Sequence, residues 1–518
     1  MSAANPEIRV NPWLVALSVM LAAFMEVLDT SIANVSLGHI AGSLSVSTDE
    51  STWVLTTYLI SNAIVIPATA WFGQRFGRKR FLMTCMVVFT AASFLCGAAT
   101  SLSMLLVMRI IQGAGGGALQ PIAQSILLEA FPREKHGQAM GLYGLGVVIA
   151  PIIGPVLGGW ITDNFTWRWI FLINVPVGIV ALLLMKRFIH DPSWIRHARP
   201  PRLDVLGFGF MALWLGCQEV LFDKGQEDDW FGSHFVVLMA VLAALGLVAF
   251  VWRMLASERP FVNLGVLKSY NFSLGLGLMF SAGVMLYGLT ATIPLLLESL
   301  LGYSALQSGY AMIPRGLGAL IAMPLAGRLV SKVPGRYLVA GGFSLFGAAS
   351  LALAGLSPDL SPGSLFWPLF LSGVSIAFIF VPLNTISLGV LPPQQLGNAS
   401  GIFNLMRNMG GSVGISLVTT FLARSAQLHQ TALVAHLTPY DPAYTFSLQT
   451  MTAGLAAAVD PAAARQTALA TLYHGVVAQA NLLAYLDNFR WFAGVAVACV
   501  AAALLFRKVK VSGPIASH

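Results

Sequence analysis

The chain has 518 residues, of which 57% are hydrophobic and only 10% are charged. Soluble proteins carry about 25% charged residues, so this composition excludes a soluble enzyme, a disordered chain and a disulfide scaffold. It also argues against an outer-membrane barrel, whose strands alternate apolar and polar residues and lack long apolar runs. The net charge of +8 is therefore expected to mark loops at one membrane surface, and no nucleic-acid partner is predicted.

Fourteen segments of the chain are apolar and long enough to cross a membrane as helices. They lie at residues 13–36, 51–72, 80–99, 104–128, 138–162, 168–187, 204–222, 234–254, 272–297, 306–330, 337–356, 365–390, 398–424 and 489–506. With the N-terminus inside, 21 of the 29 lysines and arginines fall on inner segments and five on outer ones. Positive residues concentrate on the cytoplasmic side. The sequence thus predicts an all-α polytopic membrane protein with both termini in the cytoplasm.

The spans are predicted to form two six-helix bundles with two inserted helices between them. A Gly-Arg-rich stretch follows the second span at Gly77 and recurs after the tenth span at Gly327, which indicates an internal repeat. Repeated halves around a midplane cavity are typical of secondary transporters. The predicted order is a cytoplasmic tail at 1–12, an N-terminal bundle at 13–187, a cytoplasmic linker at 188–203, the inserted helices at 204–254, a C-terminal bundle at 272–506 that contains an outer helical loop at 425–488, and a cytoplasmic tail at 507–518.

The first span carries two acids, Glu26 and Asp29, three residues apart and therefore on one face of a helix. A charge at membrane depth is costly, so both side chains are expected to face a cavity or a polar partner. Two neighbouring carboxylates outside bulk water bind a proton more readily, because desolvation and mutual repulsion both disfavour the charged form. The pair predicts a proton-binding site; a structural bond to another helix is the alternative for each acid.

The fourth span contains Arg109 but no acid of its own. Its guanidinium needs a partner from another helix, and the two acids of the first span are the economical choice. An approaching arginine favours the ionised carboxylate and a departing one favours protonation, so this contact would tie proton uptake to conformation. A fixed structural ion pair is the alternative. The glycines at 113 and 115–117 allow close helix packing, and they form no phosphate loop, since no Gly-Lys-Ser/Thr follows.

The fifth span interleaves prolines with glycines. The prolines remove backbone donors and bend the helix, and the glycines let a neighbouring helix approach. A single GxxxG pair would be weak evidence, but this dense alternation is far more specific. The residues concerned are Gly146, Pro151, Gly154, Pro155, Gly158 and Gly159.

These motifs resemble those of the major facilitator superfamily, in particular its fourteen-span drug:proton antiporters of the EmrB/QacA type and, among them, the EmrB branch. The resemblance covers nearly the whole chain. Residues 28–35 are similar to the first-helix signature, 106–113 to the arginine motif of the fourth helix and 154–159 to the antiporter motif. The segment 425–488 resembles the periplasmic loop of the EmrB type. Further matches lie at 53–58, at 222–225 with Trp230, and at 391–393 and 404–412.

The predicted cytoplasmic gate after the second span departs from the family pattern. The family has an aspartate before the arginine of this loop, and here that residue is Gln74, followed by Arg75, Gly77 and Arg78. The acid of the family's usual cytoplasmic latch is thus missing at this position. Glu26 is also outside the family signature, so its predicted role is specific to this sequence.

Polar and aromatic residues at membrane depth are predicted to line a substrate cavity between the bundles. On the thirteenth span, Asn404 and Asn408 flank Arg407 at helical spacing; this stripe either contacts the cavity or satisfies backbone groups of the inner leaflet. The aromatic candidates could equally serve helix packing. The full set is Asn34, Tyr58, Gln112, Gln120, Gln124, Tyr287, Asn384, Asn404, Arg407 and Asn408.

The resemblance implies a proton-coupled multidrug efflux antiporter of the bacterial inner membrane, which exports hydrophobic or amphipathic compounds by alternating access. Asp29, Glu26 and Arg109 would couple proton binding to transport. The proton gradient supplies the energy, so no cofactor is expected. The EmrB resemblance further implies an EmrA-like periplasmic adaptor and an outer-membrane channel, which together would form a tripartite pump.

Three alternatives remain open. The same scaffold could export one endogenous metabolite, siderophore or peptide, because a fold does not fix a substrate. A membrane-embedded hydrolase would need a nucleophile–base pair or a metal set at membrane depth; the sequence pattern contains neither, so no catalytic or metal-ligating residue is predicted. A channel would lack saturable, proton-dependent exchange.

Overall fold

The computed structural model describes residues 11–191, 204–257, 260–356, 362–456 and 460–507. Most of the predicted linker at 188–203 and nearly all of the two predicted tails lie outside these residues. The first half contains α1 (Pro12–Val35), α2 (Leu37–Leu44), α3 (Thr48–Phe76), α4 (Arg78–Gly97), α5 (Leu102–Gly116), α6 (Leu119–Ala130), α7 (His136–Asn164), α8 (Trp169–Leu172) and α9 (Asn174–Phe188). The two inserted helices are α11 (Val205–Lys224) and α12 (His234–Ala256). The second half contains α13 (Tyr270–Leu301), α14 (Ala305–Ala311), α15 (Ile313–Leu329), α16 (Gly335–Leu353), α17 (Pro362–Leu388), α18 (Pro393–Val434), α19 (Pro442–Leu455) and α20 (Pro461–Leu504).

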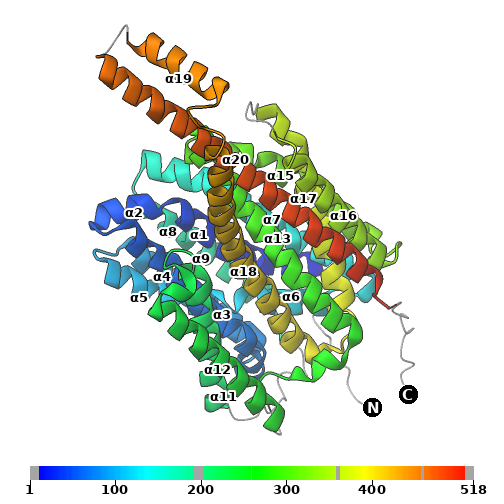
Figure 1. The fold of residues 1–518 in the computed structure, drawn as a ribbon. Helices are drawn as coiled ribbons and strands as arrows, with labels where there is room; N and C mark the ends of the chain where they lie inside the picture. The colour runs from blue at the N-terminus through cyan, green and yellow to red at the C-terminus, as the bar shows by residue number, and fades with distance from the viewer. Residues whose placement is uncertain (1–10, 192–203, 258–259, 357–361, 457–459, 508–518) are drawn as a thin grey trace, which may run out of the picture.

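Corresponding helices pack in the same way in the two halves (Figure 1). In the first half α1 packs on α7, α3 on α5 and α4 on α9; in the second half α13 packs on α18, α15 on α17 and α16 on α20. The halves meet along two matching seams, α7 against α15 and α18 against α3. The inserted helix α11 packs against both α3 and α18, and so touches both halves at one of these seams.

Twelve helices of the described residues are long and apolar enough to cross a membrane. The predicted class, a polytopic helical membrane protein, is confirmed, but two of the fourteen predicted spans do not meet this measure. The span at 306–330 is divided at Met312 into α14 and α15, of 7 and 17 residues. The span at 398–424 lies within the 42-residue α18, whose amides and Arg407 lower its mean hydropathy.

The fourth predicted span, 104–128, is interrupted rather than continuous. α5 ends at Gly116 and α6 begins at Leu119. The glycines before the break are weak helix formers, and Pro121 lacks the backbone donor that would continue the α5 hydrogen bonds. The break places Gln120 in the first turn of α6, where its side chain reaches Glu26 of α1.

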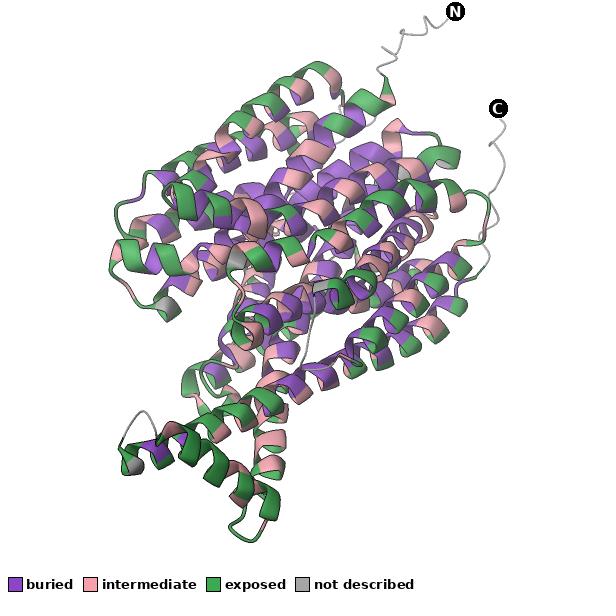
Figure 2. Ribbon diagram, turned by 90° about the horizontal axis from the view of Figure 1, so that it is seen from above, coloured by how far each residue is buried: buried purple, intermediate pink, exposed green. Residues whose placement is uncertain are grey.

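A helical projection extends beyond one end of the bundle (Figure 1). We use this name for residues 425–488, which comprise the end of α18, α19 and the first part of α20. α20 is continuous from Pro461 to Leu504, so the predicted span at 489–506 is the second part of one long helix. The projection is largely exposed, whereas the bundle interior is buried (Figure 2). α1 begins and α20 ends at the opposite end of the bundle.

Candidate transport site

A buried ion pair joins α1 to α5 in the interior of the first half. Arg109 Nη1 lies 2.5 Å from Asp29 Oδ2, and both side chains are almost completely buried. The other oxygen of Asp29 accepts hydrogen bonds from Gln112 Nε2 at 2.8 Å and from Asn174 Nδ2 at 2.6 Å. Asp29 is thus contacted by three donors, one of them the guanidinium of Arg109. The predicted partner of Arg109, an acid of the first span, is the one that the structure places beside it.

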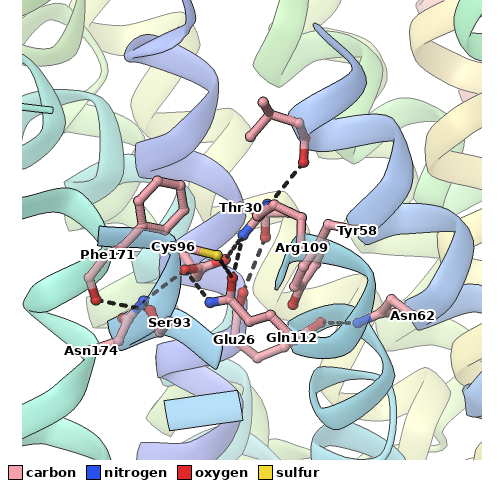
Figure 3. Close-up of polar contacts among 12 residues, drawn as sticks. Glu26, Thr30, Tyr58, Asn62, Ser93, Cys96, Arg109, Gln112, Phe171 and Asn174 are labelled. Atoms are coloured by element: carbon pink, nitrogen blue, oxygen red, sulfur yellow. Dashed lines mark hydrogen bonds and ion pairs between the residues drawn. The ribbon is translucent and has the colours of Figure 1, made fainter. Parts of the chain in front are cut away.

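Arg109 is also fixed by contacts other than its ion pair (Figure 3). Its Nε donates to the carbonyl oxygen of Val54 on α3 at 2.9 Å, and its Nη1 donates to Gln112 Oε1 at 2.9 Å. The guanidinium lies over the Tyr58 ring, 4.2 Å from its centre. Gly113 permits this approach, because a side chain there would collide with the carbonyl of Tyr58 on α3. The glycines that follow Arg109 thus bring α3 close enough to bind it.

Glu26 belongs to a different set of contacts from Asp29, although the two acids share one helix. Asn62 Nδ2 donates to Glu26 Oε1 at 3.0 Å, and Gln120 Nε2 donates to Glu26 Oε2. Gln120 Oε1 in turn accepts from Arg407 Nη2 of α18 at 2.6 Å. The direct partners of Glu26 are therefore neutral amides, and one of them links this acid to a cation of the second half. Asp29 is held within the first half, whereas Glu26 is coupled to both halves.

The predicted cavity residues meet at the contact between the two halves, but they are buried there. Gln124 of α6 donates to Asn384 of α17 at 3.2 Å and accepts from Asn404 of α18 at 2.7 Å. These three side chains are almost fully buried, so they fill the interface in this conformation rather than line a water-accessible space.

The remaining candidates for the cavity fall into two groups. Tyr58, Gln112, Gln120, Arg407 and Asn408 belong to the polar contacts around Asp29 and Glu26. Two further candidates lie apart. Asn34 is exposed near the end of α1, and Tyr287 of α13 is half-buried against Gly411 of α18.

The glycines of the predicted antiporter motif press α7 against α1. A side chain at Gly154 would collide with Ser31, one at Gly146 would meet Met20 at 2.9 Å, and one at Gly158 would meet Ile32 at 3.3 Å. Gly159 lies on another side of α7, near Leu306 of α14 in the second half.

The prolines of the same motif create a hydrogen bond between α7 and α1. Pro155 has no N–H, so the carbonyl of Pro151 lacks its usual helical partner. Ser31 Oγ of α1 donates to that carbonyl at 3.2 Å. The antiporter motif of α7 and the first-helix signature of α1 thus form the two sides of one helix contact.

A second set of glycines brings α7 against the other half. At one end, a Cβ at Gly327 of α15 would lie 2.6 Å from the carbonyl oxygen of Gly137. Toward the other end, a Cβ at Gly309 of α14 would lie 2.8 Å from Val156. The two halves are therefore in close contact on both sides of the buried polar residues, which corresponds to an occluded arrangement.

The predicted cytoplasmic gate receives its acids from elsewhere in the chain. Arg78 forms an ion pair with Glu129 at the end of α6. Asp191, which follows α9, accepts a hydrogen bond from the backbone N–H of Lys79 at 2.8 Å, and its carboxylate lies against Gly77, whose φ is +86°. Two acids thus occupy the region in which the sequence lacks the family's aspartate. Of the other predicted gate residues, Gln74 is half-buried and Arg75 is exposed.

Four polar residues of this network are not among the candidates chosen from the sequence. Asn62 and Asn174 each donate to an acid of α1, and Glu129 and Asp191 supply the gate. The sequence feature that could have identified them is an isolated polar side chain within an apolar span or at its end. A fifth, the buried Glu219 of α11, bonds to α18 instead.

Comparison with known proteins identifies the family. A sequence profile of the Major Facilitator Superfamily matches residues 19–415. The chain belongs to the major facilitator superfamily. Among solved structures of this fold, the human organic anion transporter MFSD10 (TETRAN) superposes with a TM-score of 0.58 at 14% identity, covering 96% of this chain and 100% of that one.

Two curated relatives of this superfamily member are named for export or resistance. The multidrug export protein EmrB of Haemophilus influenzae is 38% identical over 431 residues, covering 83% of this chain and 84% of the relative. The fatty acid resistance protein FarB of Neisseria gonorrhoeae is 37% identical over 428 residues, covering 82% and 84%. The resemblance to EmrB-type antiporters drawn from the motifs is thereby confirmed.

Proposed function

We propose that this protein is a proton-coupled exporter of hydrophobic and amphipathic compounds. The observation that carries the proposal is the buried Asp29–Arg109 pair, with Glu26 one turn away, at the depth where the two halves meet. Ionisable residues at membrane depth mark proton relays and substrate pathways in transporters. The names of the relatives refer to multidrug export and to fatty acid resistance, and fatty acids are themselves amphipathic.

In the proposed cycle, proton and substrate bind in alternation. When the cavity opens outward, Asp29, with or without Glu26, takes a proton and its hold on Arg109 or on the substrate weakens. The substrate leaves, the halves rock inward, and the proton is released to the cytoplasm. A ligand can shift the inward/outward balance only through different affinities for the two states, and competition between proton and substrate supplies that difference. The proton gradient drives this cycle without a cofactor, and the protein acts as a transporter rather than an enzyme.

The proposed location is the inner membrane of a bacterium, with both ends of the described chain on the cytoplasmic side and the projection in the periplasm. α1 begins and α20 ends at the same end of the bundle, opposite the projection (Figure 1). The excess of lysine and arginine on the predicted inner segments supports this orientation.

The proposed function is tested with purified protein in liposomes. We expect ethidium, a hydrophobic cation, to be pumped across the membrane when a pH gradient is imposed, and pumping to stop when an ionophore collapses the gradient. Export that proceeds equally without a gradient would overturn proton coupling. Absence of pumping for an entire panel of apolar and amphipathic compounds would overturn the assignment as a broad exporter.

The alternative is a dedicated exporter of one endogenous metabolite or siderophore. The FarB relative favours it in one respect, because its name refers to a single compound class. In an efflux-deficient host, a broad exporter protects against many unrelated compounds, whereas a dedicated one protects against one class only.

We further propose that the projection docks an EmrA-like periplasmic adaptor, which would continue to an outer-membrane channel. The projection exposes large apolar side chains at its surface, among them Tyr440 at 94% and Phe446 at 70% exposure. Between residues 425 and 488 it carries only four Asp, Glu, Lys or Arg residues. Exposed apolar side chains of this kind on a surface outside the membrane are typical of a protein interface.

Deletion of residues 430–482 tests the adaptor. We expect the variant to retain pH-driven ethidium pumping in liposomes but to lose resistance in whole cells, because the adaptor contact would be absent. The cut joins α18 to α20 where they already lie together, as shown by the 2.7 Å contact between His429 and Asp487. Loss of both activities would mean that the projection serves folding, and retention of both would exclude an obligatory adaptor.

A further inference from the structure

A third buried acid lies outside the central site, on the inserted helix α11. Glu219 is only 7% exposed, and its Oε1 accepts a hydrogen bond from Ser412 Oγ of α18 at 2.7 Å. α11 packs against α3, α12 and α18. An inserted helix that belongs to neither six-helix half thus places a carboxyl group directly against the second half.

No lysine, arginine or histidine forms an ion pair with Glu219 within the described residues. Two cations of neighbouring helices are engaged elsewhere: Arg253 of α12 pairs with Asp204 at the far end of α11, and Arg407 of α18 bonds to Gln120. A buried carboxylate without a cation is costly, and an ionisable residue at membrane depth is by default a candidate for function. The surroundings of Glu219 therefore favour a group that exchanges a proton.

A route for that proton is present on the same helix. Asp223 lies four residues after Glu219 and hence on the same face of α11. It is exposed, and it accepts a hydrogen bond from Thr56 of α3. The adjacent Lys224 pairs with Glu227 at 2.5 Å. Asp223 is thus an exposed acid at the C-terminal end of α11, a single helical turn from the buried Glu219.

Glu219 also connects to the central site through α18. Ser412 Oγ lies 3.3 Å from the carbonyl oxygen of Asn408, and Asn408 Oδ1 accepts from Arg407 Nη2 at 3.1 Å. Arg407 reaches Gln120, which bonds to Glu26. Arg407 Nη1 is buried and has no hydrogen-bond partner within the described part of the chain. A chain of contacts thus runs from Glu219 through α18 to Arg407, the cation that Gln120 links to Glu26.

We propose that Glu219 is a second proton-binding residue of the transport cycle, reached from the outer surface through Asp223. The ionised carboxylate accepts a hydrogen bond from the Ser412 hydroxyl and holds α18 against α11. The bound proton removes the negative charge, weakens this bond and lets α18 move with the second half. This role rests on the proposed proton-coupled transport, but proton binding by Glu219 can be tested without any substrate.

The direct test is infrared difference spectroscopy of the full chain in lipid nanodiscs during steps of pH. We expect the carbonyl stretch of protonated, buried carboxyl groups to change with pH, and the band component due to Glu219 to be lost in Glu219→Gln while any component from Asp29 or Glu26 remains. Glu298→Gln is the matched control, since Glu298 is an exposed acid at the end of α13; it should retain the band. An unchanged band in Glu219→Gln overturns the proposal.

A transport assay tests the role in the cycle. In liposomes under a pH gradient, Glu219→Gln is expected to pump ethidium severalfold more slowly than the wild type, and Glu219→Asp, which keeps a titratable group, to recover most of the rate. Wild-type pumping by Glu219→Gln would overturn the role even if the infrared band is lost. If the wild type itself does not pump, the proposed function fails, and the infrared band alone decides whether Glu219 binds a proton. Should Glu219→Gln fail to fold, a shifted band in Glu219→Asp supports the site and an unshifted band overturns it.

Discussion

Asparagine in place of Asp29 is expected to reduce pH-driven ethidium export to the level of protein-free liposomes. The substituted side chain keeps the shape of the original, and its amide oxygen can still accept from Gln112 and Asn174. It cannot bind or release a proton, and it no longer neutralises Arg109. The competition between proton and substrate that drives the proposed cycle would therefore be lost. The measurement is the initial rate of ethidium export under an imposed pH gradient.

The matched control for this variant is Asp163→Asn, which removes an exposed acid from α7. It should export at the wild-type rate, because its carboxylate lies outside the buried network. Undiminished drug/proton exchange by Asp29→Asn would refute the role of Asp29. Loss of exchange in Asp29→Asn with retention in Glu26→Gln would identify Asp29 as the main proton carrier, and the reverse would identify Glu26.

Removal of the arginine of this pair should strongly destabilise the protein. Arg109→Gln leaves the Asp29 carboxylate buried without its cation, and breaking a buried ion pair on one side costs about 3–5 kcal/mol. It also removes the bond to the carbonyl of Val54 and the stacking on Tyr58. The double variant Asp29→Asn/Arg109→Gln, which buries no unpaired charge, should recover part of this loss.

Thermal unfolding can be followed through the protein's own thiols. Cys85, Cys96 and Cys499 are buried and free, so a thiol-reactive fluorophore reports their exposure as the protein unfolds. Arg80→Gln, an exposed position on α4, is the control and should unfold at the wild-type temperature. A double variant that loses as much stability as the sum of the single changes would show that the two charges are not coupled.

The fold class and one central contact could be predicted from the sequence. That Glu26 and Asp29 have different partners could not. Composition, span length and motifs were sufficient to predict a polytopic helical protein of this superfamily. The partner of Arg109 followed from the scarcity of intramembrane charge. Helical spacing put Glu26 and Asp29 on one face, yet their partners come from different helices, Gln112 and Asn174 for one acid and Asn62 and Gln120 for the other. Such a difference depends on tertiary packing, which spacing alone does not encode.

The acids that sequence reasoning missed illustrate the same limit. Asp191 lies near the predicted gate, although it is more than a hundred residues from Gln74 in the sequence. Gln74 is the position at which the family pattern has its aspartate. Glu219 lies in a span whose other residues are mostly apolar, and its partner Ser412 is 193 residues away. A local pattern shows that a residue type is absent or isolated; it does not show which distant segment compensates for it.

The two glycine-rich sides of α7 differ in how easily they can part. Toward α1, contact is reinforced by the hydrogen bond from Ser31 to the carbonyl that Pro155 leaves free. Toward α15, backbone meets backbone at Gly137 and Gly327, and within the described residues no hydrogen bond joins this pair. Separation there forfeits only dispersion and weak Cα–H···O contacts. We therefore expect α7 to stay with its own half and to part from the other at this glycine pair, as a surface that must open and reclose in every turnover requires.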